Sequence, residues 1–450
     1  MPRSSTKRTT AAALAALCIL PACGSDDETS AGGSATADAG TGGTGTGAGG
    51  EATLAGPWRG AVADNLALGA SDNAEVVKTL PAGDFAVLAA SKARKVALLA
   101  VTADGLVARR ERILFPEDPG EGELTHIDFM PDGQIAAVTR TMPVVDASGT
   151  QTDCQGALVF VKIEDTEAFG ETVVEVPVGP MPDAVDISPD GRWAVVANER
   201  DAVSLYGKCA VETLSPSISV LDLSAFPTVT EAARIELDGG VGQEPEQVIF
   251  SADSDHVAVV LQDSQQVAVF TLSALLAQAA PTAADLNIVT LPNNSLDAEP
   301  WPDGAAAFTD AGGRSLYAIA GEYNDTITLL DTSGAVVKVI EVDASLIPAE
   351  IPRGAEDAPP FRPDSLTAFV TGGKAHVAAS LKNAGAVGVW DVSNPDAPVF
   401  LQAIKVGENE TAGPTEESVI GTEGISASKD GAVIVTANEG ESSASLIRRE

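Results

Sequence analysis

Basic side chains are scarce in this sequence. Its 450 residues include 27 lysines and arginines against 64 aspartates and glutamates, so the formal net charge is -37 at pH 7. A surface with this excess of negative charge repels nucleic acid and anionic lipid headgroups, so neither is expected as a partner. The same excess attracts cations and favours solubility.

Sequence signatures of common enzymes are also missing. There is no Gly-x-Ser-x-Gly nucleophile elbow, no His-Glu-x-x-His zinc helix and no glycine-rich phosphate loop. The three histidines, His126, His256 and His376, fall in different repeat units, which does not favour a shared metal site. The sequence therefore favours a protein that is not an enzyme, with no catalytic residue indicated.

Long hydrophobic runs are absent as well, and the apolar run Ala11–Leu20 near the N-terminus is too short for a permanent membrane span. Basic residues precede it, which is the layout of a secretory signal peptide. The run ends in Leu20-Pro21-Ala22-Cys23, which resembles the lipobox of bacterial lipoproteins. The resemblance implies that residues 1–22 are removed and that lipid on Cys23 anchors an exported protein to a membrane of the cell envelope.

Residues 23–53 are mostly Gly, Ala, Ser and Thr and contain almost no large apolar side chain. Such a segment cannot bury enough surface to fold, so it is expected to be a flexible tether. The folded body is then residues 54–450.

The body contains a repeat with a period of about sixty residues. Each unit has a turn signal between two short β-rich runs, as in Ala184–Ser188 and Trp193–Ala197, followed by a third and a fourth run such as Ile218–Leu223 and Ala233–Leu237. The turn signals are Pro131-Asp132-Gly133, Pro189-Asp190-Gly191, Ala252-Asp253-Ser254, Gly312-Gly313, Gly372-Gly373 and Lys429-Asp430-Gly431.

Four short antiparallel strands per unit predict an all-β fold, a seven-bladed β-propeller. The last unit ends after its third strand, so Leu54–Leu68 is expected to supply its outer strand and close the ring. One short helix is expected over Leu272–Ala284. The units begin near Glu75, Thr125, Asp183, Glu246, Asp303, Asp364 and Glu423.

Several stretches resemble the choice-of-anchor I family, which is similar to the wider YVTN and LVIVD repeat propellers. They include Met181-Pro182-Asp183 leading to Val196-Ala197-Asn198-Glu199, Glu244-Pro245-Glu246, Val389-Trp390-Asp391-Val392, and Glu423-Gly424-Ile425 leading to Ala437-Asn438-Glu439. The resemblance is strongest from about Met181 to Leu446. It implies a secreted or surface propeller with varied anchors and no settled chemistry.

Cys154 and Cys209 are the two cysteines of the body, because Cys18 leaves with the signal peptide and Cys23 takes lipid. Both fall in long loops of adjacent repeat units. In an oxidising compartment they are expected to form a disulfide, with two unpaired thiols as the alternative.

Acidic residues recur at the start of the innermost strand of five units, and four of the five follow proline. In a propeller these positions lie at one mouth of the central channel, where clustered carboxylates could hold calcium or a cationic ligand. The alternative is that each carboxylate caps its own turn. The candidate metal ligands are Asp183, Glu246, Asp303, Asp364 and Glu423.

Three functions remain open at this point. The first is a binding or scaffolding module of the cell envelope, expected as a monomer, that holds a protein, peptide or glycan outside the cytoplasm, with calcium as the one cofactor considered. The second is a metal-dependent, phosphatase-like hydrolase assembled from the acidic loops. The third is a passive structural protein of the surface.

Overall fold

The computed structural model describes residues 57–68, 74–115, 122–146, 148, 151–199, 215–237, 244–353, 359–406 and 421–450. The predictions for the signal peptide, for the lipid on Cys23 and for the tether lie outside these ranges, and so does Cys209. No helix within the ranges is both long and apolar enough to cross a membrane.

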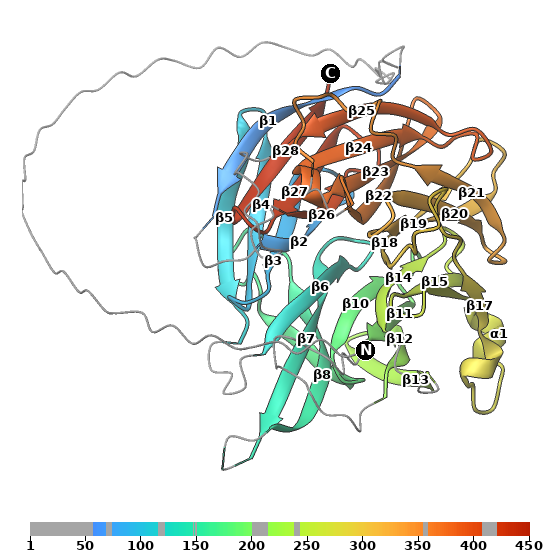
Figure 1. The fold of residues 1–450 in the computed structure, drawn as a ribbon. Coiled ribbons are helices and arrows are strands. Elements are labelled where there is room, and N and C mark those ends of the chain that lie inside the picture. Colours follow the sequence, from blue (N-terminus) through green and yellow to red (C-terminus); the bar gives the residue numbers. More distant parts are fainter. Residues whose placement is uncertain are drawn as a thin grey trace, which may run out of the picture. The chain divides into compact units, whose positions relative to one another are not determined.

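The described residues form seven antiparallel four-stranded sheets, which are the blades of a propeller (Figure 1). The blades are numbered one to seven by the order of their inner strands. These inner strands are β2 Ala74–Thr79, β6 Glu123–Phe129, β10 Pro182–Ile187, β14 Pro245–Phe250, β18 Pro302–Thr309, β22 Pro363–Thr371 and β26 Thr422–Ala427.

The second and third strands of each blade are mostly buried, because blades pack on both of their faces. The second strands are β3 Phe85–Ala90, β7 Ile135–Val145, β11 Trp193–Asn198, β15 His256–Leu261, β19 Ser315–Gly321, β23 Lys374–Leu381 and β27 Val433–Asn438. The third strands are β4 Lys95–Thr102, β8 Gln151–Lys162, β12 Ser217–Ala225, β16 Gln266–Thr271, β20 Thr326–Asp331, β24 Ala386–Asp391 and β28 Ser443–Arg449.

The outer strands are more exposed, and one of them comes from the N-terminal side of the body. β1 pairs antiparallel with β28 and completes blade seven, as the sequence predicted. The outer strands are β5 Gly105–Ile113, β9 Thr172–Val178, β13 Thr228–Glu236, β17 Asn287–Thr290, β21 Val336–Glu341, β25 Val399–Lys405 and β1 Gly60–Ala67.

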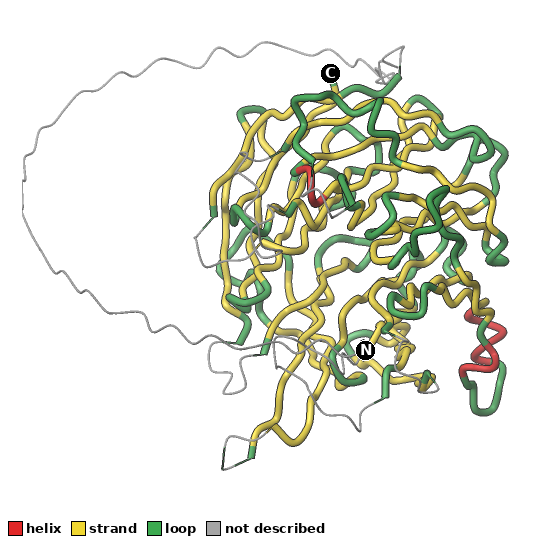
Figure 2. Tube along the Cα trace, in the orientation of Figure 1, coloured by secondary structure: helices red, strands yellow, loops and turns green. Residues whose placement is uncertain are grey.

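Helical structure is limited to short connections between strands in the described ranges (Figure 2). The helix expected over Leu272–Ala284 is shorter in the structure, where α1 covers Leu272–Leu276 and the 3-10 turn η1 covers Ala283–Asp285. Pro281 has no backbone N–H to continue the helix, which accounts for the interruption. A second 3-10 turn, η2 Lys382–Ala384, follows β23 and contacts β26 of the next blade.

The inner strands form a closed ring, because each contacts the inner strands of the blades before and after it and β2 contacts β26. Apolar side chains fill the spaces between blades, with one buried cluster at each junction of the described blades. Leu98 and Leu99 illustrate this, since these neighbours in β4 pack in clusters shared with blade two and blade seven respectively. Alternate side chains of a strand point to opposite faces, so each strand contributes to two clusters.

Polar side chains link neighbouring inner strands near the axis. The carboxylate of Asp128 accepts a hydrogen bond from the backbone N–H of Ile187 (2.7 Å), and Asp186 accepts one from Phe250 (2.6 Å) in the next blade. Ser426 likewise accepts from the N–H of Thr79 (2.9 Å), across the junction that closes the ring. These bonds fix the height of one inner strand relative to the next.

Cys154 lies within β8, so it belongs to a strand and not to a loop as the sequence suggested. β7 and β8 form a hairpin that extends beyond β9, because β9 pairs only with Gly156–Val161 of β8. The Cys154 side chain is buried. Its pairing with Cys209 stays a prediction.

Trp58 anchors the closing strand, and its removal tests the closure. The side chain is 1% exposed, donates from Nε1 to the carbonyl of Gly431 (2.9 Å) and packs at 5.6 Å from the ring of Phe369 in blade six. We expect Trp58→Ala to lower the free energy of unfolding by about 3–5 kcal/mol, because a large buried side chain and a buried hydrogen bond are lost. Urea unfolding of the full chain measures this.

Val62→Ala on β1 is the matched control, since Val62 is 40% exposed. It should change the free energy of unfolding by less than about 0.5 kcal/mol. Similar losses for the two variants would contradict the role given to Trp58.

Candidate functional site: an acidic ring at the channel mouth

The inner strands share an irregularity at their first residues. In each one the pairing with the second strand skips one or two residues, which is a β-bulge. A bulged residue is left out of the ladder, so its side chain is free to turn toward the axis. The first bulged residues of the described blades are Glu75, Thr125, Asp183, Glu246, Asp303, Asp364 and Glu423.

Six of these seven bulged residues in the described inner strands are acidic, and they include all five carboxylates that the sequence singled out. Glu75 of blade one is a sixth that the sequence analysis named only as the start of a unit. Thr125 occupies the position in blade two, where its hydroxyl contacts Thr139 (2.7 Å) and the carbonyl of Pro182 (2.5 Å). Glu123 lies beside this position and brings an acidic group to blade two as well.

The carboxylates influence one another around the mouth. Glu75 is repelled by Glu423 and by Glu123, and Glu123 in turn repels Asp183. Asp183 and Glu246 share a hydrogen bond. The remaining neighbours around the mouth also repel one another: Glu246 repels Asp303, Asp303 repels Asp364, and Asp364 repels Glu423. We call these seven acidic residues, one from each blade, the acidic ring.

A second set of side chains lies above the ring, at the first residue after the second strand of a blade. The backbone N–H of each of these residues donates a hydrogen bond to the carbonyl of the residue two positions before the bulged acid of the same blade. Glu199 donates to Met181 in this way (2.8 Å), and Lys382 donates to Arg362 (2.9 Å). We call this the apex position. In blades three to seven it is occupied by Glu199, Gln262, Glu322, Lys382 and Glu439.

In blades three and five the apex residue forms a triangle with the bulged acids of its own blade and of the next blade. In blade three, Glu199, Asp183 and Glu246 have carboxylate oxygens within 4.8 Å of one another. In blade five, Glu322, Asp303 and Asp364 meet the same criterion. These two triangles are the groups in the described residues that have a geometry suited to a metal ion. Calcium, which the sequence analysis considered, is bound by oxygen ligands of this kind.

Lys382 places a positive charge in this ring. Its Nζ lies 3.1 Å from Asp364 and 3.8 Å from Glu322, and it also forms an ion pair with Glu423. Arg362 adds a second cation, 2.6 Å from Glu322, and its guanidinium lies over the ring of Tyr323 at 4.7 Å. The chain therefore neutralises one side of its own acidic ring.

These contacts determine how the ring carboxyls ionise. Burial raises the pKa of Asp183 to about 7, with the charge of Glu123 adding to the shift and the hydrogen bond to Glu246 opposing it. Burial and then Glu199 and Asp183 raise the pKa of Glu246 well above its ordinary value. Glu423 differs: burial raises its pKa, but the charge of Lys382, hydrogen bonds with Glu439 and Lys382 and the charge of Arg362 together hold it below the ordinary value.

The three histidines lie in blades two, four and six, so they share no site. His126 is buried beside the channel, where burial and then Lys78 lower its pKa to about 3. His256 pairs with Asp253 at 2.7 Å. His376 is buried and stacks on Phe369 at 5.1 Å.

Asn198 and Asn438, which belong to the stretches that resemble the choice-of-anchor I family, are structural residues. Both side chains are fully buried. The amide of Asn438 donates to Ser443 and Ser445, and its Oδ1 accepts from Thr422 and Thr436.

Asn198 makes the equivalent donor contacts to Ser217 and Ser219, but its Oδ1 has no hydrogen-bond partner among the described residues. Pro182 and Val196 occupy the positions that the two threonines occupy in blade seven. Neither can donate to the Asn198 amide oxygen.

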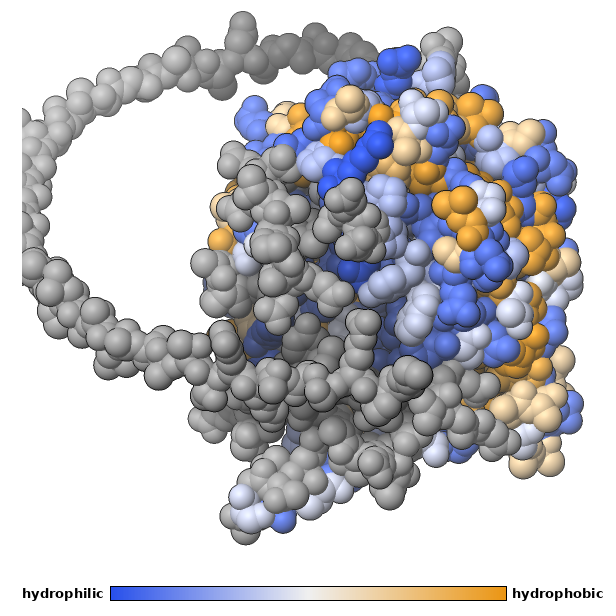
Figure 3. Space-filling view, viewed as in Figure 1, coloured by the Kyte–Doolittle hydropathy of each residue, from blue (hydrophilic) through white to orange (hydrophobic). Residues whose placement is uncertain are grey.

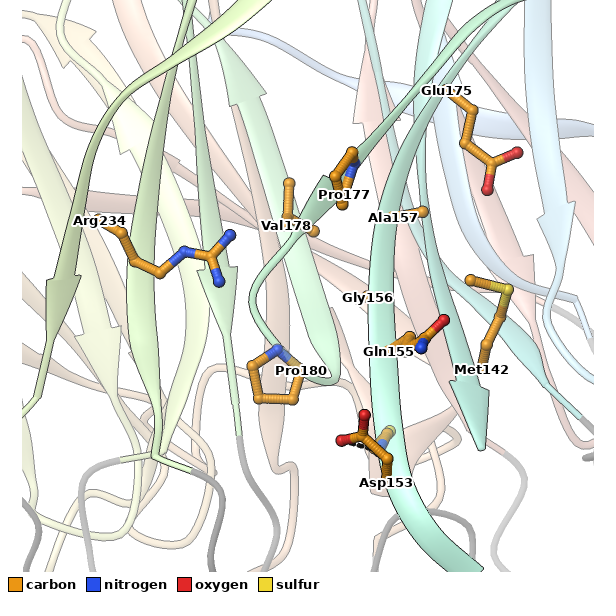
Figure 4. Close-up of a pocket in the computed structure, with 11 residues that line it drawn as sticks. Met142, Asp153, Gln155, Gly156, Ala157, Glu175, Pro177, Val178, Pro180 and Arg234 are labelled. Carbon is orange, nitrogen blue, oxygen red and sulfur yellow. Dashed lines mark hydrogen bonds between the residues drawn. The ribbon is translucent and has the colours of Figure 1, made fainter. Parts of the chain in front are cut away.

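A separate pocket of about 650 Å³ lies between blades two and three (Figure 4). Arg234 reaches toward it from β13, opposite Pro180 and Val178, and Asp153 of β8 lies at its lower end. No carboxylate of the acidic ring lines this pocket in the described residues. Figure 3 shows that hydrophilic residues dominate the described part of the face in view.

The fold and the ring define the class of protein: a seven-bladed β-propeller with acidic residues at one mouth of its channel. Residues 84–239 match the family model of the choice-of-anchor I domain, and the whole described body is a β-propeller. The matched range includes Met181–Glu199, one of the stretches on which the resemblance was based, and extends to blades one and two, where the resemblance was weaker.

The fold is also similar to solved structures of low sequence identity, and no curated protein matches the chain. The WD40 repeats of RRP9 are 12% identical with a TM-score of 0.55, covering 88% of this chain and 100% of that one. Hydrazine synthase of Kuenenia stuttgartiensis is 13% identical with a TM-score of 0.52, covering 84% and 96%. A streptogramin B lyase is 12% identical with a TM-score of 0.50, covering 86% and 97%. At these identities the likeness concerns the fold alone.

The raised pKa of Asp183 predicts how stability depends on pH. The folded chain holds a proton on Asp183 up to about pH 7, whereas the unfolded chain releases it near its ordinary pKa of 3.8. The folded state therefore binds more protons between these values, and the free energy of unfolding falls as the pH rises through this window. Lowering the pH from about 8 to about 5 should raise the unfolding free energy by at least about 1 kcal/mol.

Asp183→Asn should reduce this slope, because one of the groups that takes up a proton is gone. Calorimetric unfolding of both proteins at a series of pH values measures the difference. A wild-type chain that loses stability between about pH 8 and about pH 5, or an unchanged slope in the variant, would show that Asp183 is not crowded as described.

The orphaned amide oxygen of Asn198 predicts a stabilising substitution. Val196→Thr places a hydroxyl where Thr436 stands in blade seven, with little change in volume, so it should satisfy Asn198 Oδ1. We expect the free energy of unfolding to rise by about 1 kcal/mol in urea titrations, the usual contribution of a buried hydrogen bond.

Val195→Thr is the matched control, because Val195 is equally buried and points to the other face of β11. It should destabilise the chain. Destabilisation by Val196→Thr as well would contradict the proposed hydrogen bond.

Proposed function

We propose that this chain is a binding module of the bacterial cell envelope, which uses the acidic ring to hold a positively charged group of a protein, peptide or glycan partner. Export and anchoring through lipid on Cys23 are part of the proposal. Residues 1–22 resemble a signal peptide and Leu20-Pro21-Ala22-Cys23 resembles a lipobox, and both support this part of the proposal. The resemblance to the choice-of-anchor I family supports it too, because that resemblance implies a secreted or surface propeller.

The observation that carries the binding role is the acidic ring itself. Bulges at the start of the inner strands bring an acidic residue to the same mouth in six of the described blades, and Glu123 beside the bulge supplies one in blade two. Bulges often re-aim side chains beside functional sites, and like charges held together lower the stability of the empty site. A cationic ligand relieves that repulsion, which gives the ring a reason to bind one.

The ring does not favour the hydrolase alternative. A hydrolytic centre needs a few carboxylates with distinct roles gathered at one point of a pocket. Here the carboxylates are distributed around a mouth, one from each blade, and the pocket between blades two and three holds none of them. The two triangles offer oxygen ligands of the kind that calcium prefers, so calcium is a cation that could join the ring to its partner.

Partner capture from the cell envelope tests the proposal. The full chain, extracted in mild detergent after chemical crosslinking, is compared with a variant that neutralises the mouth, Asp183→Asn with Glu246→Gln and Asp303→Asn. The control variant neutralises three exposed acids away from the ring, Asp104→Asn with Glu350→Gln and Asp396→Asn, so the change in net charge is the same.

We expect a partner to be recovered with the wild type and the control but not with the mouth variant, and to be lost as salt is added before crosslinking. All three proteins should unfold cooperatively, which shows that they are folded. Recovery of the same partner with the mouth variant, or of no partner with any of them, would overturn the proposed role of the ring.

A further inference from the structure

Aromatic and apolar side chains reach the surface at the rim of the channel mouth in blade five. Tyr323 follows the apex residue Glu322 and is 46% exposed. Trp301, which is partly buried, lies two residues before the ring acid Asp303, and its ring centroid is 5.7 Å from that of Tyr323. Leu296, in the connection that leads to β18, is 85% exposed. We call Leu296, Trp301 and Tyr323 the rim patch.

The Tyr323 side chain is fixed in place although it is exposed. The guanidinium of Arg362 lies 4.7 Å from the centroid of the Tyr323 ring and donates a hydrogen bond to the Tyr323 hydroxyl (3.0 Å). The Trp301 ring contacts the Tyr323 ring at an interplanar angle of 54°. Side chains that are fixed before binding lose little conformational entropy when a partner covers them. Tyr323 is therefore prepared for contact with another molecule.

Leu296 lies in a segment that is fixed to the same rim. The side-chain amide of Asn294 donates to the carbonyl of Asn324 (3.0 Å), and the amide of Asn324 donates to the carbonyl of Ala298 (3.1 Å). Because Asn324 directly follows Tyr323, these two bonds hold the segment of Leu296 beside the segment of Tyr323. The most exposed leucine of the described chain thus belongs to the same surface as the aromatic pair.

The surroundings of the rim patch carry unbalanced negative charge. Residues 235–313, which include blade four and the inner strand of blade five, contain twelve acidic residues and no lysine or arginine. Two of these acids, Asp297 and Glu299, are exposed and close to Leu296 in the chain. Partner surfaces carry charge complementary to the surface they meet. A surface that matches this one is apolar at its centre and basic around it.

Tryptophan, tyrosine and arginine are the residue types that most often dominate the binding energy of protein interfaces. The rim patch contains the first two and is supported by the third, Arg362. We infer that the rim patch is the docking contact for a protein partner, which covers it with an apolar side chain flanked by lysine or arginine. The inference rests on the proposed function, and it names a protein as the class of partner that the acidic ring holds.

A glycan fits the rim patch less well than a protein does. The rings of Trp301 and Tyr323 are tilted by 54°, and Arg362 lies over the Tyr323 ring, so the pair offers no common flat surface to a row of sugar rings. Leu296 offers no hydrogen bond to a sugar hydroxyl. An apolar side chain of a protein gains from contact with all three members of the patch.

Selection of peptides from a random library displayed on phage tests the inference, with the full wild-type chain as the target. We expect the selected peptides to share an aromatic or aliphatic residue flanked by lysine or arginine. A synthetic peptide of the shared sequence is then titrated by isothermal titration calorimetry. Tyr323→Ala should weaken its binding at least about tenfold and Leu296→Ser at least about threefold, because contacts at the centre of the interface are lost.

Val370→Ser is the matched control, because Val370 is 50% exposed and lies near the last residue of β22, at the end of that strand opposite the mouth. It should leave the affinity of the peptide within about twofold of the wild type. Leu296→Ser separates docking from folding, since so exposed a leucine contributes little to the core. The melting temperature of this variant should equal that of the wild type.

Selected peptides without a shared sequence, or peptide binding that both rim variants leave unchanged, would overturn the inference. So would binding of an oligosaccharide on a glycan array that Tyr323→Ala abolishes, or a dimer of the chain in sedimentation that Leu296→Ser dissociates.

None of these results contradicts the proposed function as long as the variant with a neutralised mouth loses its captured partner. Peptide binding that needs the rim patch but survives Asp183→Asn with Glu246→Gln and Asp303→Asn would do the opposite. It would contradict the proposed role of the acidic ring and leave the rim patch as the docking contact.

Discussion

Repulsion among carboxylates at one mouth of the channel is the constraint on which the rest of this structure depends. The propeller closes because each blade buries apolar side chains against both neighbours, and this closure brings the starts of all inner strands together. Each start is bulged, and an acidic group lies at or beside every bulge in the described blades. Folding therefore confines like charges that an open array of sheets would keep apart.

The chain offsets part of this repulsion with its own cations. Lys382 forms ion pairs with acids of blades five, six and seven. Arg362 forms a further ion pair with Glu322, through a planar guanidinium that can make two parallel hydrogen bonds to a carboxylate. Burial raises the pKa of Asp183 and Glu246 on the other side of the ring, and it raises the pKa of Asp364 beside Lys382 as well.

Much of the fold could be predicted from the sequence, because turn signals and strand patterns repeat at a fixed spacing. The closing role of β1 followed from the missing outer strand of the last unit. Four ring acids were recognisable because they follow proline, and Glu423 because it begins a unit of the same kind. Glu75 was missed because it stands alone before Val76 with no proline to mark it.

Other features depend on information that no local pattern contains. A β-bulge is a shift in register between two strands, so its position follows from pairing and not from residue type. Lys382 is basic, so the recurrence of acidic residues does not reveal it, although its place after Leu381 is the register of Glu199 after Asn198. Cys154 was placed in a loop because the length of the β7–β8 hairpin exceeds that of the other units.

The ionisation of Asp183 tests the central claim most directly, since crowding and burial in the ring are what set it apart from an exposed aspartate. Carbon-detected NMR titration of a full chain labelled at aspartate carboxyls measures it, with Asp183→Asn used to assign the resonance. The account predicts a pKa of about 7, against an ordinary value of 3.8. A midpoint near the ordinary value would contradict the acidic ring as it is described.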